Sequence, residues 1–274
     1  MVLAILAAGF GCAVYAYLSL PNVRLLRTQN PSTTAFIELR AREAVTKGET
    51  TRRLQRWVPY NRISSSLTRA VLVAEDGTFW QHDGVDYEQL RDALEVSVER
   101  MEFVRGASTI TQQLAKNLYL SPSRNPVRKL RELLIARRLE AELSKQRILE
   151  LYLNVIEWGD GIYGAEAAAR QYFRMSAAQL GPQESALLAA AIVNPRLLDP
   201  GHPTARLRRR QQMILRRMGG VVAPPATETS PPAIEVVPPI PAAPPGSLEV
   251  LPGEALPVGK TPGRGGGVQP DGSA

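Results

Sequence analysis

Cysteine and histidine are scarce in this chain of 274 residues. A single cysteine, Cys12, excludes an internal disulfide framework, and only two histidines, His82 and His202, exclude a histidine-rich metal site. Aromatic residues make up 6% of the chain, but 44% of all residues are apolar, enough to bury the core of one or two domains. The formal net charge of +7 favours anionic partners: nucleic acid, phospholipid head groups or a phosphorylated substrate. Charge alone does not choose among them.

Charged residues are absent from the start of the chain. Val2 to Leu20 is a run of nineteen uncharged residues, about the length that a helix needs to cross a bilayer core. A basic start and a small-residue cleavage motif, which would indicate a signal peptide, are not evident. We therefore expect an uncleaved transmembrane anchor over residues 1–23. Arg24 and Arg27, which follow it, favour a cytoplasmic location for the rest of the chain, so charge does not settle the orientation.

Composition divides the rest of the chain into three parts. Residues 24–47 are polar and basic and are expected to form a membrane-proximal connector. Residues 48–218 contain few prolines and much helical patterning, and they form the expected folded domain. The segment 219–274 holds 13 of the 22 prolines and 10 of the 21 glycines and has no aromatic residue, which predicts a disordered tail. A plain spacer is favoured over a polyproline segment that binds a groove.

Helical periodicity dominates the middle region. Between residues 128 and 154 leucines recur at spacings of three and four, and Ser144 is a candidate cap that divides this segment into two helices. Further helices are expected over residues 182–193, before an Asn-Pro pair, and over the basic segment 202–218. No alternating pattern of convincing length indicates a strand. The domain is therefore predicted to be mainly α-helical.

Two adjacent carboxylates, Glu75 and Asp76, follow an apolar run and precede aromatic residues. A carboxylate with apolar neighbours tends to have a raised pKa, which suits proton transfer near neutral pH. Solvated acids at the end of a helix would give the same pattern, and this window alone favours that simpler interpretation.

Arg128 and Glu132 are spaced so that both side chains lie on one face of a helix. As a surface ion pair they would contribute only ~0.3–0.5 kcal/mol. As part of a site, Arg128 would bind an anion while Glu132 is held beside it. Lys145 and Glu150 carry the same ambiguity.

The stretch GASTITQQLAKN, residues 106–117, is unusually rich in uncharged polar side chains. Its first residues are small enough for the backbone to approach a ligand closely. Its hydroxyl and amide groups offer hydrogen bonds to sugar or phosphate oxygens, and Lys116 adds a positive charge. A helix capped by Ser108 or Thr109 explains part of the pattern. It leaves several polar residues without a role: Thr111, Gln112, Gln113 and Lys116.

Four windows, taken in order, resemble the peptidoglycan glycosyltransferases, specifically the monofunctional biosynthetic transglycosylases with one membrane anchor. They are EDGTFWQHDGVD at 75–86, GASTITQQLAKN at 106–117, RKLRE at 128–132 and KQRILELYLNVIEWGDGIYG at 145–164. One window would be weak evidence, whereas four in order behind an apolar N-terminal segment are specific. The resemblance covers about residues 50 to 200. Its one mild departure is Ala107, where a second glycine is frequent.

The resemblance implies a lysozyme-like helical domain on the periplasmic side of the cell inner membrane, attached by a single-pass anchor. Enzymes of this family polymerise lipid II, a disaccharide-pentapeptide on a polyprenyl pyrophosphate. The growing lipid-linked glycan chain is the donor, and the sugar 4-hydroxyl of incoming lipid II is the acceptor. A β-1,4 glycan forms with inversion, and polyprenyl pyrophosphate leaves. A divalent cation (Mg or Mn) at the pyrophosphate is a candidate cofactor, without assigned ligands. Other cell wall synthesis and division proteins are candidate partners.

Carried over residue by residue, the resemblance implies two catalytic carboxylates. Glu75 corresponds to the general base on the acceptor hydroxyl, and Glu132 corresponds to the second essential carboxylate. The positions implied to contact substrate or to shape its site are Asp76, Phe79, His82, Ser108, Thr109, Gln112, Gln113, Lys116, Asn117, Arg128, Lys129 and Lys145. The positions implied to have a more structural role are Glu150, Tyr152, Asn154, Gly159 and Gly164.

The implied chemistry agrees with the residue types. A pyrophosphate leaves readily once its charge is neutralised, so Lys116 and Arg128 are suited to stabilise it and no strong acid is needed. The demanding step is to make a sugar hydroxyl nucleophilic, which calls for one positioned base of raised pKa. The two carboxylates therefore need not act as the acid and nucleophile of a retaining glycosidase. Three apolar residues between the first two windows are expected to dip into the membrane interface: Met101, Phe103 and Val104.

Two other classes of protein compete with this interpretation. A lysozyme or lytic transglycosylase that cleaves peptidoglycan would share the fold but needs a catalytic acid and no pyrophosphate site. A non-catalytic membrane scaffold would use the proline-rich tail for binding, and the presence of Glu75 and Glu132 argues against it. Nucleic-acid binding would depend only on the arginines of residues 206–217, which a basic helix near anionic lipid explains equally well, so no nucleic acid is expected.

Overall fold

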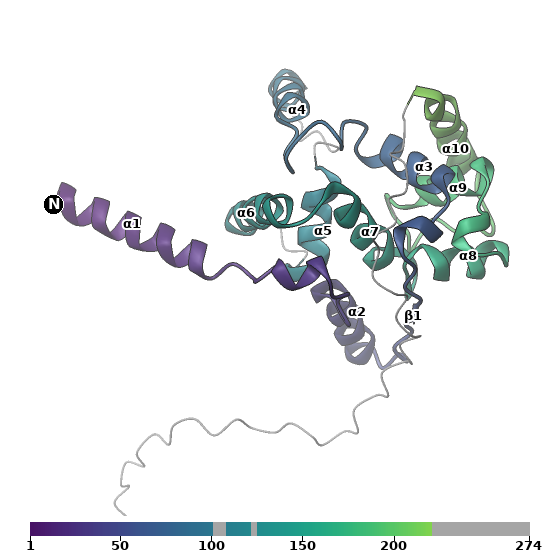
Figure 1. Ribbon diagram of the computed structural model, residues 1–274, viewed down its shortest axis with the longest axis horizontal. Coiled ribbons are helices and arrows are strands. Elements are labelled where there is room, and N and C mark those ends of the chain that lie inside the picture. The colour runs from purple at the N-terminus through teal and green to yellow at the C-terminus, as the bar shows by residue number, and fades with distance from the viewer. Residues whose placement is uncertain (101–107, 122–124, 221–274) are drawn as a thin grey trace, which may run out of the picture. The chain divides into compact units, whose positions relative to one another are not determined.

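The structure is a computed structural model that describes residues 1–100, 108–121 and 125–220 (Figure 1). Expectations for Met101, Phe103, Val104 and Ala107, and for the tail beyond residue 220, lie outside these described residues.

The prediction of a mainly helical fold is confirmed. The helices in this part of the chain are α1 (Val2–Leu18), α2 (Ala35–Thr46), α3 (Ser65–Glu75), α4 (Tyr87–Arg100), α5 (Ile110–Tyr119), α6 (Pro126–Glu142), α7 (Lys145–Val155), α8 (Ala165–Phe173), α9 (Pro182–Ala191) and α10 (Ala205–Arg217). Short 3-10 turns are η1 (Arg24–Arg27), η2 (Tyr60–Arg62), η3 (Ala177–Gln179) and η4 (Met218–Gly220).

The N-terminal helix α1 is shorter than the anchor that the sequence predicts. It covers 17 residues and ends at Leu18, whereas a spanning helix needs about 20 apolar residues. Across residues 1–100, 108–121 and 125–220, no helix has the combination of length and apolar character that crossing a membrane requires. The prediction of a transmembrane helix over residues 1–23 is therefore not borne out.

The segment 24–47, expected as a connector, is folded. Leu26 of η1 and Ile37 of α2 are buried. Thr34 caps α2, because its side chain accepts a hydrogen bond from the Ile37 amide at 3.1 Å. Helix α2 packs on α5, so this segment contributes directly to the body that carries the site.

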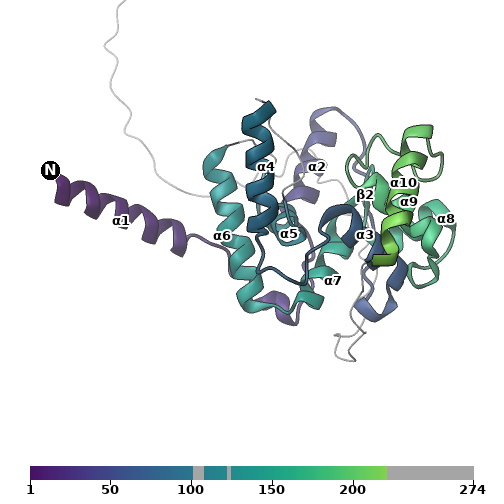
Figure 2. The ribbon, with the colours of Figure 1, turned by 90° about the horizontal axis from the view of Figure 1, so that it is seen from above.

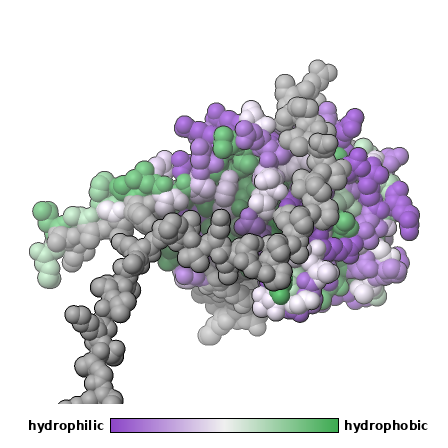
Figure 3. Space-filling model, turned by 90° about the horizontal axis from the view of Figure 1, so that it is seen from below, coloured by the Kyte–Doolittle hydropathy of each residue, from purple (hydrophilic) through white to green (hydrophobic). Residues whose placement is uncertain are grey.

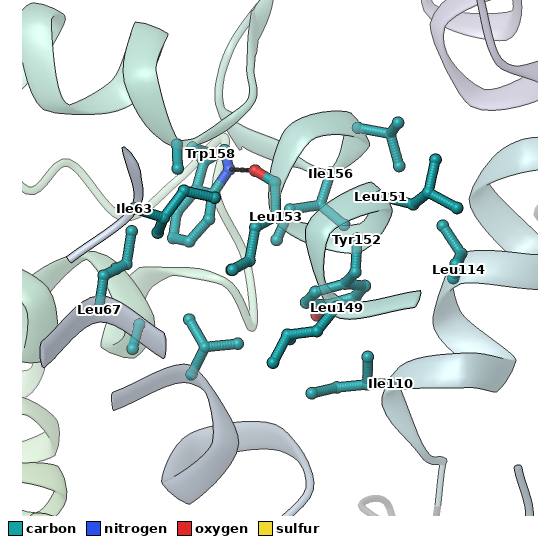
Figure 4. Packing of buried hydrophobic residues seen from close by; sticks show 14 of the residues in the cluster. Ile63, Leu67, Ile110, Leu114, Leu149, Leu151, Tyr152, Leu153, Ile156 and Trp158 are labelled. Atoms are coloured by element: carbon teal, nitrogen blue, oxygen red, sulfur yellow. Dashed lines mark hydrogen bonds between the residues drawn. The ribbon is translucent and has the colours of Figure 1, made fainter. Parts of the chain in front are cut away.

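Helix α7 lies in the centre of the hydrophobic core. Every residue from Arg147 to Val155 is buried. Figure 4 shows its leucines and Tyr152 between side chains of α5, such as Ile110, and side chains from the start of α3, such as Leu67. The predicted division at Ser144 is confirmed, because its hydroxyl accepts the Arg147 amide at 3.2 Å and caps α7. A helix that is buried from its third residue to its end needs partners on all sides, and α5, α6 and α8 pack against it.

Helices α3, α9 and α10 form a second packed group (Figure 2). Residues 185–191 of α9 are all buried and consist of serine, alanine and leucine. Small side chains let the neighbouring helices approach closely. The predicted end of this helix before Asn194-Pro195 is confirmed, since α9 ends at Ala191. This packing fixes the direction of α3, and with it the position of the carboxylate at its C-terminus.

A small sheet, which the sequence analysis did not predict, completes the fold. Its order is β1 (Leu54–Gln55), β3 (Ile162–Tyr163), β2 (Glu157–Gly159), with β1 parallel and β2 antiparallel to β3. Strands of two or three residues are too short to produce a readable alternation.

Two glycines of the last sequence window are required by close packing around the sheet. A Cβ at Gly159 would lie 1.9 Å from the Tyr172 hydroxyl. Gly164 has a φ of +83°, and a Cβ there would lie 2.8 Å from the Asn154 carbonyl oxygen. Both positions therefore exclude side chains, in line with the structural role that the resemblance implies for them.

Buried polar side chains of α7 hold the segment before α3. The Asn154 amide accepts from the Val58 N–H at 2.9 Å and donates to the Val58 carbonyl at 2.9 Å. The Glu150 carboxylate accepts from the Tyr60 N–H at 3.0 Å and is paired with Arg147. These hydrogen bonds satisfy backbone N–H and C=O groups that helix and sheet hydrogen bonds leave unpaired, so they hold a loop inside the core.

Asn154→Ala is expected to lower the free energy of unfolding by about 2–4 kcal/mol, because it leaves the Val58 N–H and C=O buried without partners. Urea unfolding followed by circular dichroism measures this loss. Asn61→Ala, at an exposed position of η2, is the matched control and should change the free energy by less than about 0.5 kcal/mol. Equal, small effects of both substitutions would show that the loop is held by other contacts.

Candidate active site

Glu75 is the last residue of α3, and its side chain is only 13% exposed. The apolar face of the helix, which includes Leu67, Val71 and Leu72, is buried and directs the C-terminal end toward the interior. Burial raises the pKa of the Glu75 carboxyl above its ordinary value. The prediction of a raised pKa at this position is therefore confirmed.

A chain of two hydrogen bonds orients the Glu75 carboxylate. The Gln113 side-chain amide donates to Glu75 Oε2 at 2.9 Å, and the Tyr152 hydroxyl donates to Gln113 Oε1 at 3.0 Å. Tyr152 is fully buried, and burial together with the nearby acids raises its pKa well above the ordinary value. Its hydroxyl therefore stays protonated and fixes the orientation of the Gln113 amide, which turns the NH2 group toward the carboxylate.

Arg210 of α10 is a member of the site that the sequence analysis missed. Its Nη2 lies 3.9 Å from Glu75 Oε1, and the cation opposes the rise in the pKa of the carboxyl. The sequence showed only a cluster of arginines on an amphipathic helix. Leu207 and Ile214 are the buried apolar residues of that helix, and the intervening Arg210 lies toward α3. In the sequence, only its spacing from Leu207 and Ile214 distinguishes Arg210 from the exposed arginines beside it, because this spacing places it next to the buried face of the helix.

Asp76 and His82 form a second connected pair beside Glu75. His82 Nε2 lies 3.0 Å from Asp76 Oδ1, and His82 Nδ1 accepts from the Gly84 N–H at 3.2 Å. Because Nδ1 accepts, Nε2 carries the proton and donates to the carboxylate. Asp76 Oδ2 also accepts from the Ile110 N–H at 2.9 Å. These bonds join the loop after α3 to the first residue of α5.

Phe79 is fully buried, and Lys145 lies over its ring, with Nζ 4.5 Å from the centroid. Lys145 also donates to the His82 carbonyl and forms an ion pair with Glu140 at 2.8 Å. Glu140 in turn accepts from the Thr111 hydroxyl. Lys145 is thus paired with Glu140, not with Glu150, and it braces the loop 76–84. Direct substrate contact by Lys145 stays a prediction.

The start of the polar stretch 106–117 is a helix cap. Thr109 accepts from the Gln112 N–H at 3.2 Å while Gln112 Oε1 accepts from the Thr109 N–H at 3.2 Å, a reciprocal capping box. The Thr109 hydroxyl donates to the Gly84 carbonyl at 2.7 Å. A simple helix cap left Thr111 and Gln112 without a role. Both side chains form hydrogen bonds within the protein, Thr111 to Glu140 and Gln112 to the Thr109 N–H. Asn117, through its donation to the Gln113 carbonyl at 2.8 Å, supports the same helix.

Glu132 is buried on α6 and is held by two cations. Arg128 Nη1 lies 2.6 Å from Glu132 Oε2, and Lys129 pairs with the other oxygen. Lys129 also donates to the Ser108 hydroxyl at 3.2 Å, which connects α6 to the start of the polar stretch. The Glu132 side chain is only 4% exposed, so its pair with Arg128 is not the solvated surface ion pair that the spacing of these residues in the sequence allowed.

The positive charge of Lys116 interacts with both carboxylates of the site, Glu75 and Glu132. Burial lowers the pKa of its ammonium group, while Glu132 and Glu75 both act to raise it. Arg128 and Lys129 act in the same direction as burial, so this part of the site has an excess of positive charge. Within the described parts of the chain, the Lys116 ammonium forms no hydrogen bond or ion pair. It is the cation of the site best placed to accept an anionic ligand.

The site is not arranged as a metal centre of protein ligands. Within the ranges that the structure describes, no three His, Cys, Asp or Glu side chains gather in a way that could hold a metal ion. Glu132 is committed to Arg128 and Lys129, and Asp76 to His82 and a backbone amide. The residues present do not fit a divalent cation bound by the protein alone.

The tertiary structure thus brings the predicted residues together from four separate helices. Glu75 comes from α3, Gln113 and Lys116 from α5, Glu132 from α6 and Tyr152 from α7. The link between Tyr152 and Gln113 was not predicted, since the sequence analysis assigned the tyrosine to a structural motif.

Comparison with known proteins shows the family of the chain. The sequence profile of the family described as Transglycosylase matches residues 42–219. The chain is 47% identical to a biosynthetic peptidoglycan transglycosylase of Janthinobacterium sp. over 195 residues, which is 71% of this chain and 84% of that protein. It is 55% identical over 167 residues to the protein of that name from Aromatoleum aromaticum, covering 61% of this chain and 73% of the relative. The counterpart from Laribacter hongkongensis is 49% identical over 196 residues, 71% and 86% of the two chains. The chain belongs to the transglycosylase family.

Proposed function

We propose that this chain, a peptidoglycan glycosyltransferase of bacterial cell wall synthesis, polymerises lipid II. The observation that carries the proposal is a largely buried, hydrogen-bonded carboxylate of raised pKa, Glu75, whose charge interacts with a partly buried ammonium group, Lys116, that also interacts with Glu132. A base and an anion-binding cation in one site are what glycosyl transfer from a pyrophosphate requires.

In the proposed reaction, Glu75 takes the proton from the 4-hydroxyl of the acceptor sugar. That oxygen forms a bond to C1 of the donor sugar on the face opposite the leaving group, and the bond from C1 to the pyrophosphate oxygen breaks. The electron pair of this bond leaves with the polyprenyl pyrophosphate, and the proton stays on Glu75. The product is a β-1,4-linked glycan with an inverted anomeric centre.

Lys116 and Arg128 are assigned to the departing pyrophosphate. Charge-assisted hydrogen bonds to its oxygens stabilise negative charge as the bond to C1 lengthens. Glu132 has a supporting role, because its pairing with Arg128 at 2.6 Å and with Lys129 keeps both cations directed toward the site. No step is assigned to a metal ion.

The proposal places the protein in the cell envelope, at the periplasmic face of the inner membrane. Its donor and acceptor are both attached to membrane lipids, so the site must reach the membrane surface. A lysozyme-like arrangement of the helical domain and interactions with other cell wall synthesis proteins are part of the same proposal.

A peptidoglycan-cleaving enzyme is the competing function. Such an enzyme acts on a glycan without a pyrophosphate, so it has no use for a partly buried ammonium group whose charge interacts with the base. Lys116 therefore favours synthesis over cleavage. The outcome that would favour cleavage is release of soluble muropeptides from purified cell wall together with no polymer from lipid II.

Glu75→Gln is expected to lower the rate of lipid II polymerisation at least about a hundredfold, because the amide keeps the hydrogen bond to Gln113 but accepts no proton. Glycan strands formed from labelled lipid II, separated by gel electrophoresis, measure the rate. Glu88→Gln, on the exposed side of α4, is the control and should leave the rate unchanged. Normal polymerisation by the Glu75 variant would remove the base assignment.

Arg210→Gln is expected to shift the acid limb of the kcat/KM profile to higher pH. Glu75 acts as a base only when ionised, and its raised pKa already costs activity as the pH falls. Loss of the cation 3.9 Å away disfavours the carboxylate further, so its pKa rises again. Arg209→Gln removes the same charge from an exposed neighbouring position and should leave the profile in place. A shift to lower pH, or equal shifts in both variants, would refute the role of Arg210.

Tyr152→Phe is expected to lower kcat about fivefold to tenfold with little change in KM, because it removes one hydrogen bond that positions Gln113 and leaves the substrate contacts intact. Steady-state polymerisation kinetics separate the two constants. Tyr119→Phe, on α5 but without a bond to Gln113, is the control. A rise in KM alone would indicate that Tyr152 contributes to substrate binding instead.

A further inference from the structure

A pocket of about 270 Å³ lies where the end of α1 meets α6, away from Glu75. Its lining combines aromatic and aliphatic side chains with two arginines and an amide: Tyr17, Leu18, Leu20, Asn22, Arg24 and Arg138. No residue of the proposed reaction is among them. The lining is therefore suited to a ligand that is apolar at one end and anionic at the other.

The polar side of the pocket carries an excess of positive charge. Arg24 Nε and Arg27 Nη2 share a single carboxylate, Glu142, at 2.9 and 2.7 Å. The guanidinium of Arg138 lies 5.6 Å from the centre of the Tyr17 ring. Three arginines face one glutamate, so a further negative charge would be attracted here.

The C-terminal end of α1, which would repel an anion, is partly neutralised. Helix carbonyls at a C-terminus carry partial negative charge. Arg131 Nη2 donates to the Ser19 carbonyl at 3.3 Å, just beyond the last helical residue. This bond places a third cation, Arg131, near the pocket that Arg24 and Arg138 line.

Apolar side chains continue from the pocket along α1. Leu18, in the lining, is 74% exposed, and Phe10 and Leu3, further along the helix, are 72% and 83% exposed. Figure 3 shows the hydrophobic surface of this helix beside the more hydrophilic surface of the domain. Exposed apolar groups that adjoin a cationic pocket match the two parts of a lipid, the acyl chain and the phosphate.

We propose that the pocket between α1 and α6 binds the phosphate head group of an anionic phospholipid, with Arg24 and Arg138 at the phosphate and α1 against the acyl chains. The proposal deepens the proposed function, because an enzyme with lipid-linked substrates needs a fixed position at the membrane surface. It concerns a lipid that is neither donor nor acceptor. The pocket and the reaction therefore can be tested separately.

The test is flotation of the full-length protein with vesicles of phosphatidylcholine, alone or mixed with phosphatidylglycerol. We expect tighter binding to the mixed vesicles, and a loss of about fivefold in affinity for each arginine removed in Arg24→Gln/Arg138→Gln. The matched control is Arg42→Gln/Arg137→Gln, which removes the same net charge from exposed positions outside the pocket. The control should retain most of the binding.

Three outcomes would overturn the proposal. Equal losses in the two double variants would show general charge attraction instead of a pocket. Equal binding to both kinds of vesicle would show that the phosphate of an anionic lipid is not recognised. Release from mixed vesicles by inorganic phosphate, at constant ionic strength, would show that the pocket takes free phosphate and not a lipid.

Polymerisation of lipid II in detergent separates this proposal from the proposed function. The Arg24→Gln/Arg138→Gln variant should polymerise at the wild-type rate in detergent, where no vesicle is needed, and thermal unfolding should confirm that it is folded. If the wild-type protein binds mixed vesicles but forms no polymer, the proposed function fails while the lipid pocket stands. If it polymerises but shows no preference for mixed vesicles, only the lipid pocket fails.

Discussion

The burial of α7 from Arg147 to Val155 is the constraint on which the rest of the structure depends. A helix buried over most of its length must satisfy its polar side chains inside the protein, and those of α7 bond to several other parts of the chain. Asn154 and Glu150 hold the loop before α3 through Val58 and Tyr60. Tyr152, two residues from each of them, reaches Gln113 of α5 instead. One buried helix therefore fixes both the segment that leads into α3 and the amide that orients Glu75 at its end.

The two carboxylates of the site differ in their partners, and this difference supports the separate roles proposed for them. Glu75 is contacted by a neutral amide, and its nearest cation is 3.9 Å away, so burial prevails and the pKa of its carboxyl rises. Glu132 is in direct contact with Arg128 and Lys129. A carboxylate that keeps a high proton affinity suits a base, whereas one surrounded by cations suits the task of holding those cations in place. The charge of Lys116 interacts with both carboxylates, and in the proposed function this residue binds the pyrophosphate.

Helix α6 takes part in both proposals. It carries Glu132 and Arg128 of the candidate active site and, nearer its C-terminal end, Arg138 of the α1 pocket. A rigid helix that carries both sites would hold the reacting groups at a constant distance from bound lipid. The family match over residues 42–219 starts beyond α1, so the pocket combines the matched domain with a segment outside it.

The sequence by itself determined the helical class, the break at Ser144 and the end of α9, and it proposed most of the residues of the candidate site. Periodicity, caps and prolines act over a few residues, so a linear reading recovers them. It did not yield the two- and three-residue strands, whose pairing is entirely non-local, and it predicted a spanning helix where α1 covers 17 residues. Only the tertiary structure decided that Arg210 lies beside Glu75 and that Tyr152 orients Gln113. Those contacts join positions far apart in the chain, and helix packing, which no local pattern encodes, sets the distances between them.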